Sequence, residues 1–350
     1  MGAPCTPTLP CSASTPRLVV FNRVPKCGSS SLEAIIKRQA TVERRFSFLR
    51  DKDFVNNSLD DAEQSLFART LTDAAKSRTR TLYDRHVLYV DFASFGLPRP
   101  VYINLLRDPL RMQVSAFYFW RQCICATRQG FCSIAMATNP QSRAALCRAD
   151  YTIDTLYANM SVRPTVGLMT RWFCGHGRAC GGVASHRDPY HQPPLASRRV
   201  RDEALRRALD NLRNQYLWVG VLERLEDSLR LLTKLLPGYF GRLVVERAAR
   251  EHVRPRSNSS YYTYSMPNAA TLEKLRVESE NDLKVYDEAV RILDCRLAGC
   301  GLHAAPKLAP AAAAPSTTSA PADAGPIVTA NRAAEYLLRK RHHRHDSEKA

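Results

Sequence analysis

Residues 25–31 hold the densest group of chemically active side chains in the sequence. They read PKCGSSS and follow a short apolar run at residues 18–21. A small-residue loop between a strand and a helix exposes consecutive backbone N–H groups at the positive end of the helix dipole, where an anion is stabilised. Lys26 adds a mobile cation, and the serines add hydroxyl donors. The loop is therefore a candidate phosphate-type site, and an ordinary strand-to-helix turn is the alternative.

A second candidate anion site follows the apolar run at residues 101–106. Arg107 stands at the carboxyl end of this run, the edge at which open α/β sheets bind ligands, and its guanidinium suits bidentate contact with phosphate. Ser115 lies about two turns into the helix predicted after Pro109. The alternative is a structural pair of Arg107 with Asp108 and a solvent-facing serine.

His86, in the segment YDRHVLYVDF at residues 83–92, is the candidate general base. Among side chains, histidine has the unperturbed pKa best placed for accepting a proton at neutral pH. A purely structural histidine is the alternative. Asp84 would raise the pKa of His86 if its carboxylate lay near the imidazole.

Short apolar runs that alternate with helical patterns predict the elements that position these residues. The predicted strands are residues 18–21, 101–106 and 217–221. Each is followed by a loop and then by apolar side chains at helical spacing: Leu32, Ile35 and Ile36; Leu110, Val114 and Phe117; Leu225, Leu229, Leu232 and Leu236. This alternation predicts an α/β fold with a central parallel sheet flanked by helices.

Helix ends are predicted from local signals. Ser30 or Ser31 is the expected N-cap of the first helix, and Pro237 with Gly238 is expected to end the third. Residues 273–293 are predicted to form one long final helix. Residues 123–200 are rich in Cys, Pro and Gly and receive no assignment.

Composition divides the chain into three parts. Residues 1–16 are expected to be a disordered leader, and residues 17–300 one domain, since a chain of 350 residues that is 45% hydrophobic can build a large core. Residues 301–350 are rich in Ala and Pro and then basic, which predicts a disordered tail. No apolar run of roughly 18 residues occurs, and residues 1–15 lack a signal-peptide pattern. The formal net charge of +18 favours polyanionic partners.

The eleven cysteines favour an oxidising compartment. Several are close in sequence, as in local disulfide loops, and the tidiest pairs are Cys174 with Cys180 and Cys295 with Cys300. Zinc is the rival interpretation, but no CxxC pair is present and His176 is the only nearby histidine between cysteines. Three sequons, at Asn56, Asn159 and Asn258, agree with a secretory glycoprotein.

Two alternative classes of protein could also account for an anion-binding loop and a basic charge. A P-loop kinase or ATPase would need its lysine after the last glycine of the loop, whereas Lys26 precedes Gly28. A non-catalytic polyanion-binding protein would explain the charge, but not the presence together of Lys26, His86, Arg107 and Ser115.

Five segments occur in an order that resembles one enzyme family. They read FNRVPKCGSSS, RHVLYVDFASFG, PVYINLLRDPLRMQVSAFYFWR, WFCGH and YLWVGVLERLEDSLRLLTKLLPGYF, within residues 17–294. The chain resembles the uronyl 2-O-sulfotransferases, which include the heparan sulfate, chondroitin/dermatan sulfate and Pipe-like enzymes. The resemblance implies the P-loop-like sulfotransferase fold, the sulfate donor PAPS (3′-phosphoadenosine 5′-phosphosulfate), and transfer to the 2-hydroxyl of a uronic acid in a glycosaminoglycan.

The resemblance also implies which residues bind PAPS. Those expected at its 5′-phosphosulfate are Lys26, Gly28, Ser29, Ser30 and Ser31. Arg107 and Ser115 correspond to the pair that holds the 3′-phosphate. Lys26 would also act in catalysis, because it and the loop N–H groups would stabilise the charge that develops on the departing phosphate.

The remaining implied roles concern the acceptor and the disulfides. His86 would be the catalytic base, Arg23 would contact the acceptor, and Cys174 would be bonded to Cys180. The resemblance further implies a polyanionic glycosaminoglycan acceptor, a homo-oligomer and a Golgi location, with no metal and no nucleic-acid partner. It leaves heparan sulfate and chondroitin/dermatan sulfate open as acceptors.

Overall fold

Five parallel strands form the central sheet of the protein. A computed structural model describes residues 11, 15–43, 46–51, 57–77, 80–126, 144–148, 150–159, 167–180, 197–252 and 265–303. Within them the strands are β1 (Leu18–Asn22), β2 (Ser47–Arg50), β3 (Thr81–Arg85), β4 (Val101–Leu106) and β5 (Tyr216–Val221). Their order is β2-β3-β1-β4-β5, and every neighbouring pair is parallel. The predicted α/β fold with a parallel sheet is confirmed.

β1 lies where the direction of the sheet order reverses. After β1 the chain passes to β2 and β3 on one side, and then returns to β4 and β5 on the other. Ligands of open α/β sheets bind outside the carboxyl ends of the strands at such a point. The segments that follow β1, β3 and β4, which begin with Arg23, His86 and Arg107, therefore meet at the expected ligand edge.

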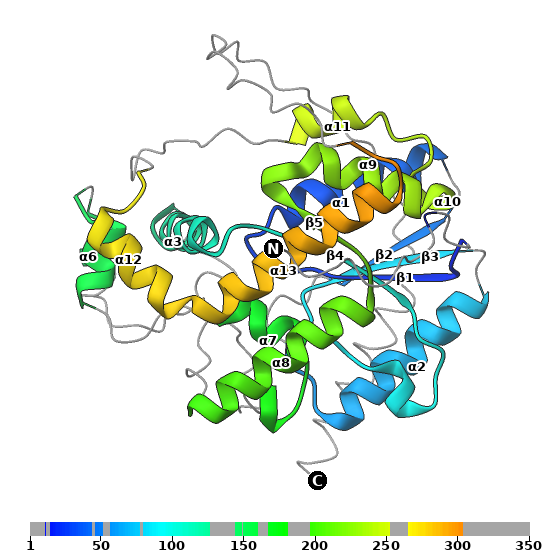
Figure 1. Ribbon diagram of the computed structural model, residues 1–350, viewed down its shortest axis with the longest axis horizontal. Helices are drawn as coiled ribbons and strands as arrows, with labels where there is room; N and C mark the ends of the chain where they lie inside the picture. The colour runs from blue at the N-terminus through cyan, green and yellow to red at the C-terminus, as the bar shows by residue number, and fades with distance from the viewer. Residues whose placement is uncertain are drawn as a thin grey trace.

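Helices cover both faces of the sheet (Figure 1). One face packs against α1 (Ser29–Glu43), α9 (Leu225–Leu235), α10 (Pro237–Phe240) and α11 (Val245–His252), and the other against α2 (Asp61–Ser77), α7 (Leu168–Cys174) and α8 (Arg198–Asn214). Alternate residues of β1 supply the two cores, with Val19 and Phe21 toward α1 and Leu18 and Val20 toward α2. Both faces of β1 are thus buried.

A smaller apolar cluster lies beside the sheet at its ligand edge. It joins α3 (Pro109–Ala126), α6 (Ile153–Asn159) and α12 (Ala269–Glu278). α13 (Glu280–Gly299) then runs back along the sheet beside β5, and short 3₁₀ helices lie at Phe92–Phe95 (η1), Arg178–Cys180 (η2) and Leu222–Arg224 (η3). Among the described helices, none combines the length and the apolar character that crossing a bilayer requires.

Two predicted helix boundaries are wrong. The final helix is broken at Ser279, because Leu275 on α12 packs in the small cluster whereas Val285 on α13 packs in the core of the sheet, so the axis must change direction. The first helix begins at Ser29, earlier than an N-cap at Ser30 or Ser31 allows. The end predicted at Pro237 is confirmed, since α9 stops at Leu235.

The cysteines form both local and long-range bonds. Cys174 is bonded to Cys180, and Cys125 to Cys147. The expected pairing of Cys295 with Cys300 is wrong, because Cys300 is bonded to Cys11 with a Cα–Cα distance of 5.3 Å.

Parts of the expected leader contact the domain. Besides the bond of Cys11 to Cys300, the carbonyl of Pro16 accepts a hydrogen bond of 2.7 Å from the hydroxyl of Tyr239. Residues 304–350 of the expected tail lie outside the described residues.

Candidate active site

The segment after β1 folds as a tight loop that leads directly into α1. Gly28 has a left-handed φ of 79°, and a Cβ added there would lie 2.6 Å from Cδ1 of Leu222, so the position favours glycine twice over. The carbonyl of Gly28 accepts the N–H groups of Ser31 at 3.0 Å and Leu32 at 3.2 Å, which begins the helix. The N–H groups of Ser29 and Ser30, which precede these two bonds, lie at the start of the helix, where N–H groups have no intrahelical acceptor.

Lys26 holds a strained backbone conformation in the middle of this loop. Its φ of 64° is the one positive φ of a non-glycine residue in the described part of the chain. Such conformations cost about 1–3 kcal/mol and cluster at ligand sites. The Nζ of Lys26 lies 3.7 Å from the ring centroid of Phe119 on α3, so the aromatic face holds the cation over the loop.

One side of α3 lies against the loop. The Sδ of Met112 lies 3.7 Å from the Sγ of Cys27, and the ring of Phe119 contacts Lys26. Ser115 stands three residues after Met112 and four before Phe119, a spacing that puts all three on one face of the helix. Ser115 is thereby placed beside the loop.

Arg107 follows β4 directly and is half-buried next to the same loop. Burial raises the pKa of the Cys27 thiol well above its usual range, while the charge and the backbone of Arg107 act to lower it, which shows how close the two residues are. Asp108 accepts the N–H of Arg111 at 2.8 Å, and Pro109 takes the first position of α3. A capped helix start therefore fixes the position of Arg107.

His86 follows β3 and is tied to the first residue after β1. Its Nδ1 lies 2.8 Å from the carbonyl oxygen of Arg23, which can only accept, so in the neutral ring Nδ1 carries the proton and Nε2 the lone pair. β1 and β3 remain paired up to this point, since the N–H of Arg23 donates to the carbonyl of Arg85 at 3.1 Å. The ring of Trp172 stands edge-on to the imidazole, 6.2 Å away between centroids.

The surroundings of His86 favour the neutral imidazole. Burial lowers the pKa of His86 to about 3, and the positive charges of Arg23, Arg50 and Lys26 act in the same direction. Asp84 is not among the largest influences on this pKa, and its carboxylate oxygens lie 3.0 Å from Nε of Arg23 and 3.8 Å from Nε of Arg50. The imidazole is therefore unprotonated near pH 7, and Nε2 is the atom able to accept a proton.

Arg23 belongs to a buried cluster of ion pairs at the start of the loop. Its side chain is only 2% exposed, and its guanidinium lies 2.8 Å from Glu33 and 3.0 Å from Asp84. Arg50 reaches the same two carboxylates from β2, at 2.9 Å and 3.8 Å. Removal of one member would leave buried charge uncompensated, so this cluster stabilises the start of the loop. The described ion pairs of Arg23 are internal, and its contact with an acceptor stays a prediction.

Residues that the sequence analysis did not single out surround the backbone at residues 22–24. The carbonyl of Asn22 accepts the indole N–H of Trp172 at 2.6 Å and the amide of Asn104 at 2.8 Å. Tyr216 on β5 approaches the side-chain amide of Asn22 at 2.9 Å. Asn104 carries a sequence signal, since it is an amide within the apolar run VYINLL, whereas Trp172 and Tyr216 are indistinguishable from ordinary core aromatics.

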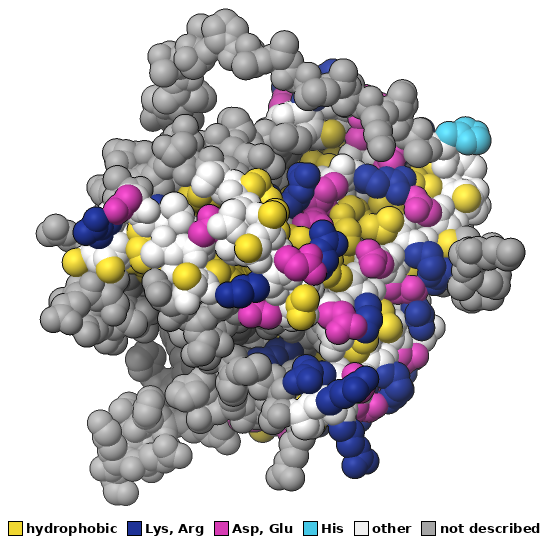
Figure 2. Space-filling view, turned by 60° about the vertical axis from the view of Figure 1, so that its left-hand side comes forward, with side chains coloured by type: hydrophobic (Ala, Val, Ile, Leu, Met, Phe, Trp, Pro, Cys, Tyr) yellow, Lys and Arg dark blue, Asp and Glu magenta, His cyan; other side chains and the backbone are white. Residues whose placement is uncertain are grey.

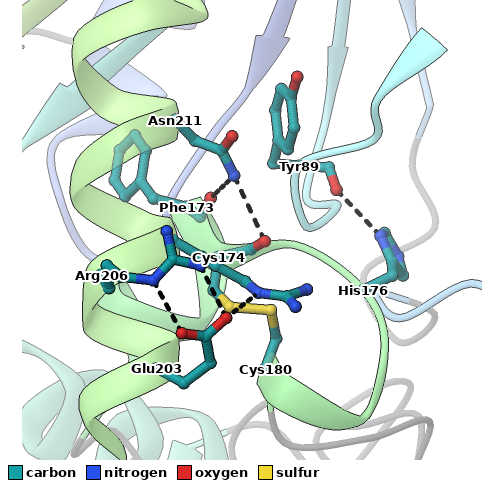
Figure 3. Close-up of a disulfide and its surroundings, with 9 residues drawn as sticks. Tyr89, Phe173, Cys174, His176, Cys180, Glu203, Arg206 and Asn211 are labelled. Atoms are coloured by element: carbon teal, nitrogen blue, oxygen red, sulfur yellow. Dashed lines mark hydrogen bonds and ion pairs between the residues drawn. A yellow bond between two sulfur atoms is a disulfide. The ribbon is translucent and has the colours of Figure 1, made fainter. Parts of the chain in front are cut away.

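The Cys174–Cys180 disulfide closes a short loop at the end of α7 (Figure 3). Within this loop, Nδ1 of His176 lies 3.0 Å from the carbonyl oxygen of Tyr89. Asn211 on α8 donates to the carbonyl of Cys174 at 3.4 Å. These bonds hold the helix that carries the aromatic neighbour of His86.

Basic side chains are spread over the surface, with a local excess on α8. Figure 2 shows Lys and Arg interspersed with Asp and Glu over the described part of one face. The α8 sequence RRVRDEALRRALDNLRN carries six arginines against three acidic residues. Arg198, Arg199 and Arg206 line a shallow hollow of about 740 Å³ together with Asp202 and Glu203. A polyanion that bound in this hollow would contact the three arginines, between which the two carboxylates lie.

The structure brings most of the predicted site residues to one edge of the sheet. The loop residues Lys26, Gly28, Ser29, Ser30 and Ser31 lie between Arg107 and Ser115 on one side and His86 on the other. An anion held by the cation and the N–H groups would thus be next to a neutral imidazole, which is what transfer of an anionic group to a hydroxyl requires. Of the three sequons, Asn56 and Asn258 lie outside the described residues, and Asn159 ends α6.

Comparison with known proteins identifies the family of this site. The sequence pattern of the sulfotransferase family matches residues 14–290. The chain belongs to the sulfotransferase family. This sulfotransferase is 27% identical over 274 residues to the heparan sulfate 2-O-sulfotransferase hst-2 of Caenorhabditis elegans, a match that covers 74% of the chain and 72% of the relative.

Two further relatives of this sulfotransferase come from vertebrates. The heparan sulfate 2-O-sulfotransferase 1 of Gallus gallus is 30% identical over 268 residues, 74% of the chain and 65% of the relative. The uronyl 2-sulfotransferase of Homo sapiens is 30% identical over 227 residues, 64% of the chain and 50% of the relative. The chain thus spans between half and about three quarters of the length of these relatives.

Proposed function

We propose that this sulfotransferase transfers sulfate from PAPS to the 2-hydroxyl of a uronic acid in a glycosaminoglycan, either heparan sulfate or chondroitin/dermatan sulfate. The observation that carries the proposal is the hydrogen bond from Nδ1 of His86 to the carbonyl of Arg23. It attaches a neutral base to the start of the anion-binding loop in a chain whose relatives are named for sulfate transfer to this class of hydroxyl.

The donor side of the site fits a phosphosulfate. The left-handed φ angles of Lys26 and Gly28 shape the loop that leads into α1, whose first N–H groups would bind the 5′-phosphosulfate together with the lysine cation. Arg107 and Ser115 then stand beside the loop at the end of β4 and on α3, where they would hold the 3′-phosphate of the donor. PAPS, when bound there, supplies an activated sulfuryl group on a good leaving phosphate.

The base side of the site fits a hydroxyl acceptor. A sugar hydroxyl is a poor nucleophile at neutral pH, and Nε2 of His86 would take its proton as it attacks, a contribution of about 10²–10⁴-fold. Lys26 and the N–H groups of the loop would stabilise the negative charge that develops on the departing phosphate. Donors held in place before the reaction act most where charge appears, which explains why the strained loop is useful.

The partner and the compartment are part of the same proposal. A net charge of +18 and the arginines of α8 support a polyanionic acceptor chain. Disulfides at Cys11–Cys300, Cys125–Cys147 and Cys174–Cys180 support residence in an oxidising compartment, and we propose the Golgi lumen.

The test is incubation of the protein with radiolabelled PAPS and a panel of desulfated heparan, chondroitin and dermatan chains, followed by disaccharide analysis. We expect label on the 2-position of uronic acid, and the panel identifies which chain is used. A parallel reaction with His86→Ala controls for contaminating enzyme. Heparin binding without PAPS turnover, or a magnesium-dependent preference for ATP over PAPS, would contradict the proposal.

A further inference from the structure

Asn104 is a buried amide in the middle of an apolar strand. It lies on β4 between Ile103 and Leu105, all three of which are fully buried. An amide taken out of water costs several kcal/mol unless its hydrogen bonds are replaced, so leucine would be the ordinary choice at such a position. The amide must therefore supply something that the strand alone does not.

All four hydrogen bonds of the Asn104 amide are made. Its Nδ2 donates to the carbonyl of Asn22 at 2.8 Å and to Oδ1 of Asn22 at 3.1 Å. Its Oδ1 accepts the N–H of Leu105 at 2.9 Å and that of Val24 at 3.4 Å. An asparagine side chain has two N–H groups and an oxygen with two lone pairs, so its capacity is fully used.

These bonds begin where the backbone pairing of two strands stops. The register of β1 with β4 ends at Phe21 opposite Ile103. Beyond it, at the switch point of the sheet, the side chain of Asn104 takes the place of the ladder and holds the backbone on both sides of Arg23. β1 and β4 can thus separate to form the ligand edge while residues 22–24 stay fixed to β4.

The fixed segment joins the two halves of the candidate active site. Arg23 gives its carbonyl to Nδ1 of His86 at 2.8 Å, and Lys26 follows three residues later. The indole of Trp172 donates to the same carbonyl of Asn22 that Asn104 binds, at 2.6 Å. A shift of this short backbone segment would therefore move the base and the donor loop together.

We propose that Asn104 is a positioning residue that holds the donor loop and, through the Arg23 carbonyl, the imidazole of His86. It touches neither donor nor acceptor and acts through the backbone at residues 22–24. The effect on catalysis rests on the proposed function, whereas the effect on the backbone does not.

The test compares Asn104→Leu with Ile103→Ala. Asn104→Leu keeps the side-chain size and removes all four bonds; Ile103→Ala leaves them and opens a cavity on the opposite face of the same strand. Amide hydrogen exchange of Val24 in the ligand-free protein is measured first, relative to amides of β5. Affinity for 3′-phosphoadenosine 5′-phosphate, kcat and the donor KM follow, at a temperature where both variants are folded.

We expect Asn104→Leu to speed exchange of the Val24 amide by about tenfold beyond any change in β5. Nucleotide affinity and kcat should each fall by about tenfold, the equivalent of one lost hydrogen bond. Ile103→Ala should lower thermal stability with both values near wild type. If Asn104→Leu does not fold, Asn104→Ala and Asn104→Asp replace it, the second keeping the acceptor and losing the donor.

The positioning role would be overturned if two results were found together. Exchange in Asn104→Leu would change by the same factor at Val24 and in β5, and this variant would bind the nucleotide as tightly as Ile103→Ala does. The exchange experiment needs neither donor nor acceptor. An absence of sulfate transfer to glycosaminoglycans would therefore count against the proposed function alone. An unchanged exchange rate at the Val24 amide would count against the positioning role of Asn104 alone.

Discussion

Two half-buried histidines occupy similar local settings in different regions of the molecule. His86 at the end of β3 and His176 in the disulfide loop each place Nδ1 at hydrogen-bond distance from a backbone carbonyl, at 2.8 Å and 3.0 Å. Burial lowers the pKa of both, to about 3 for His86 and about 4 for His176. Neither the burial nor the tautomer therefore separates a base from a structural histidine.

Charge and position separate them. Three cations, Arg23, Arg50 and Lys26, act on His86, and one of them belongs to the candidate anion-binding loop. His176 faces Arg85 and Asp61, whose effects on its pKa oppose each other, and its Nε2 is buried with no hydrogen-bond partner among the described residues (Figure 3). An acceptor beside the donor loop would lie next to the first imidazole, whereas the second lies in the disulfide loop at the end of α7.

The largest effect is expected from His86→Ala. Sulfate transfer should fall by about 10²–10⁴-fold, because the proposed general base is removed, while nucleotide affinity stays near wild type, since we propose that the donor is held by the loop, Arg107 and Ser115. Transfer assays, calorimetry with 3′-phosphoadenosine 5′-phosphate and melting temperature are measured on the same protein.

His176→Ala is the matched control for that experiment. It should lower the melting temperature and leave transfer by the folded fraction close to wild type. Transfer by His86→Ala within about threefold of wild type would remove the base assignment, since such a group contributes at least about 10²-fold. Equal losses of transfer and nucleotide affinity would place His86 with His176 as a structural residue.

Lys26→Ala tests the cation that distinguishes the two regions. It should lower kcat/KM for PAPS by about 10–10²-fold, which corresponds to a charged hydrogen bond of about 1.5–3 kcal/mol, and by more where charge builds up in the transition state. Lys76→Ala, which removes an exposed lysine paired with Asp73 on α2, serves as the control and should leave kcat/KM unchanged. A value of kcat/KM for Lys26→Ala equal to that control would exclude the lysine from the site.

Opening the disulfide loop should have a smaller effect on activity than on stability. The double variant Cys174→Ala/Cys180→Ala frees a short closed loop, and we expect a loss of about 2–3 kcal/mol in the free energy of unfolding. Transfer by the folded fraction should fall only a few-fold, through looser packing of Trp172 on the ring of His86. Urea unfolding and transfer assays measure both; mass mapping of the oxidised wild type that finds two free thiols would contradict the pairing itself.

The smallest effect is expected on the pH dependence. A base must be unprotonated to act, and a lowered pKa keeps His86 neutral at more acidic pH than an ordinary histidine, whose pKa is about 6.5. The acid limb of kcat/KM should therefore lie below pH 6.5, with little change between about pH 8 and pH 6. A midpoint at or above pH 6.5 would mean that a nearby anion has a larger effect on the pKa of the imidazole than the cations have.

Sequence patterns predicted the parts of the fold whose cause is local. β1, β4 and β5 are apolar runs, and the breaks after them are marked by small residues, proline or charge. β3 was not predicted, because its sequence TLYDR ends in two charged residues that are buried. Asp84 and Arg85 are compensated by Arg23 and Arg50 and by Asp51, which come from other segments, so no local pattern could reveal them.

The candidate site shows the same division. The loop at residues 25–31 and Arg107 are read from short motifs, because a tight anion-binding turn depends on residues close in sequence. The contacts of Asn104 with Asn22, and of Trp172 with the same carbonyl, join strands and helices separated by 82 and 150 positions. Register and packing create those contacts, and residue types alone do not specify either.

The bond between Cys11 and Cys300 gives the domain a mechanical property. It joins a point shortly before β1 to a point directly after α13, across 289 positions of sequence. A tension that enters the chain before Cys11 and leaves it after Cys300 would pass through one covalent link, and the sheet between them would carry almost none of the load. Thermal fraying at either end is likewise stopped before it reaches β1, so the strand that opens into the donor loop is anchored from outside as well as from within.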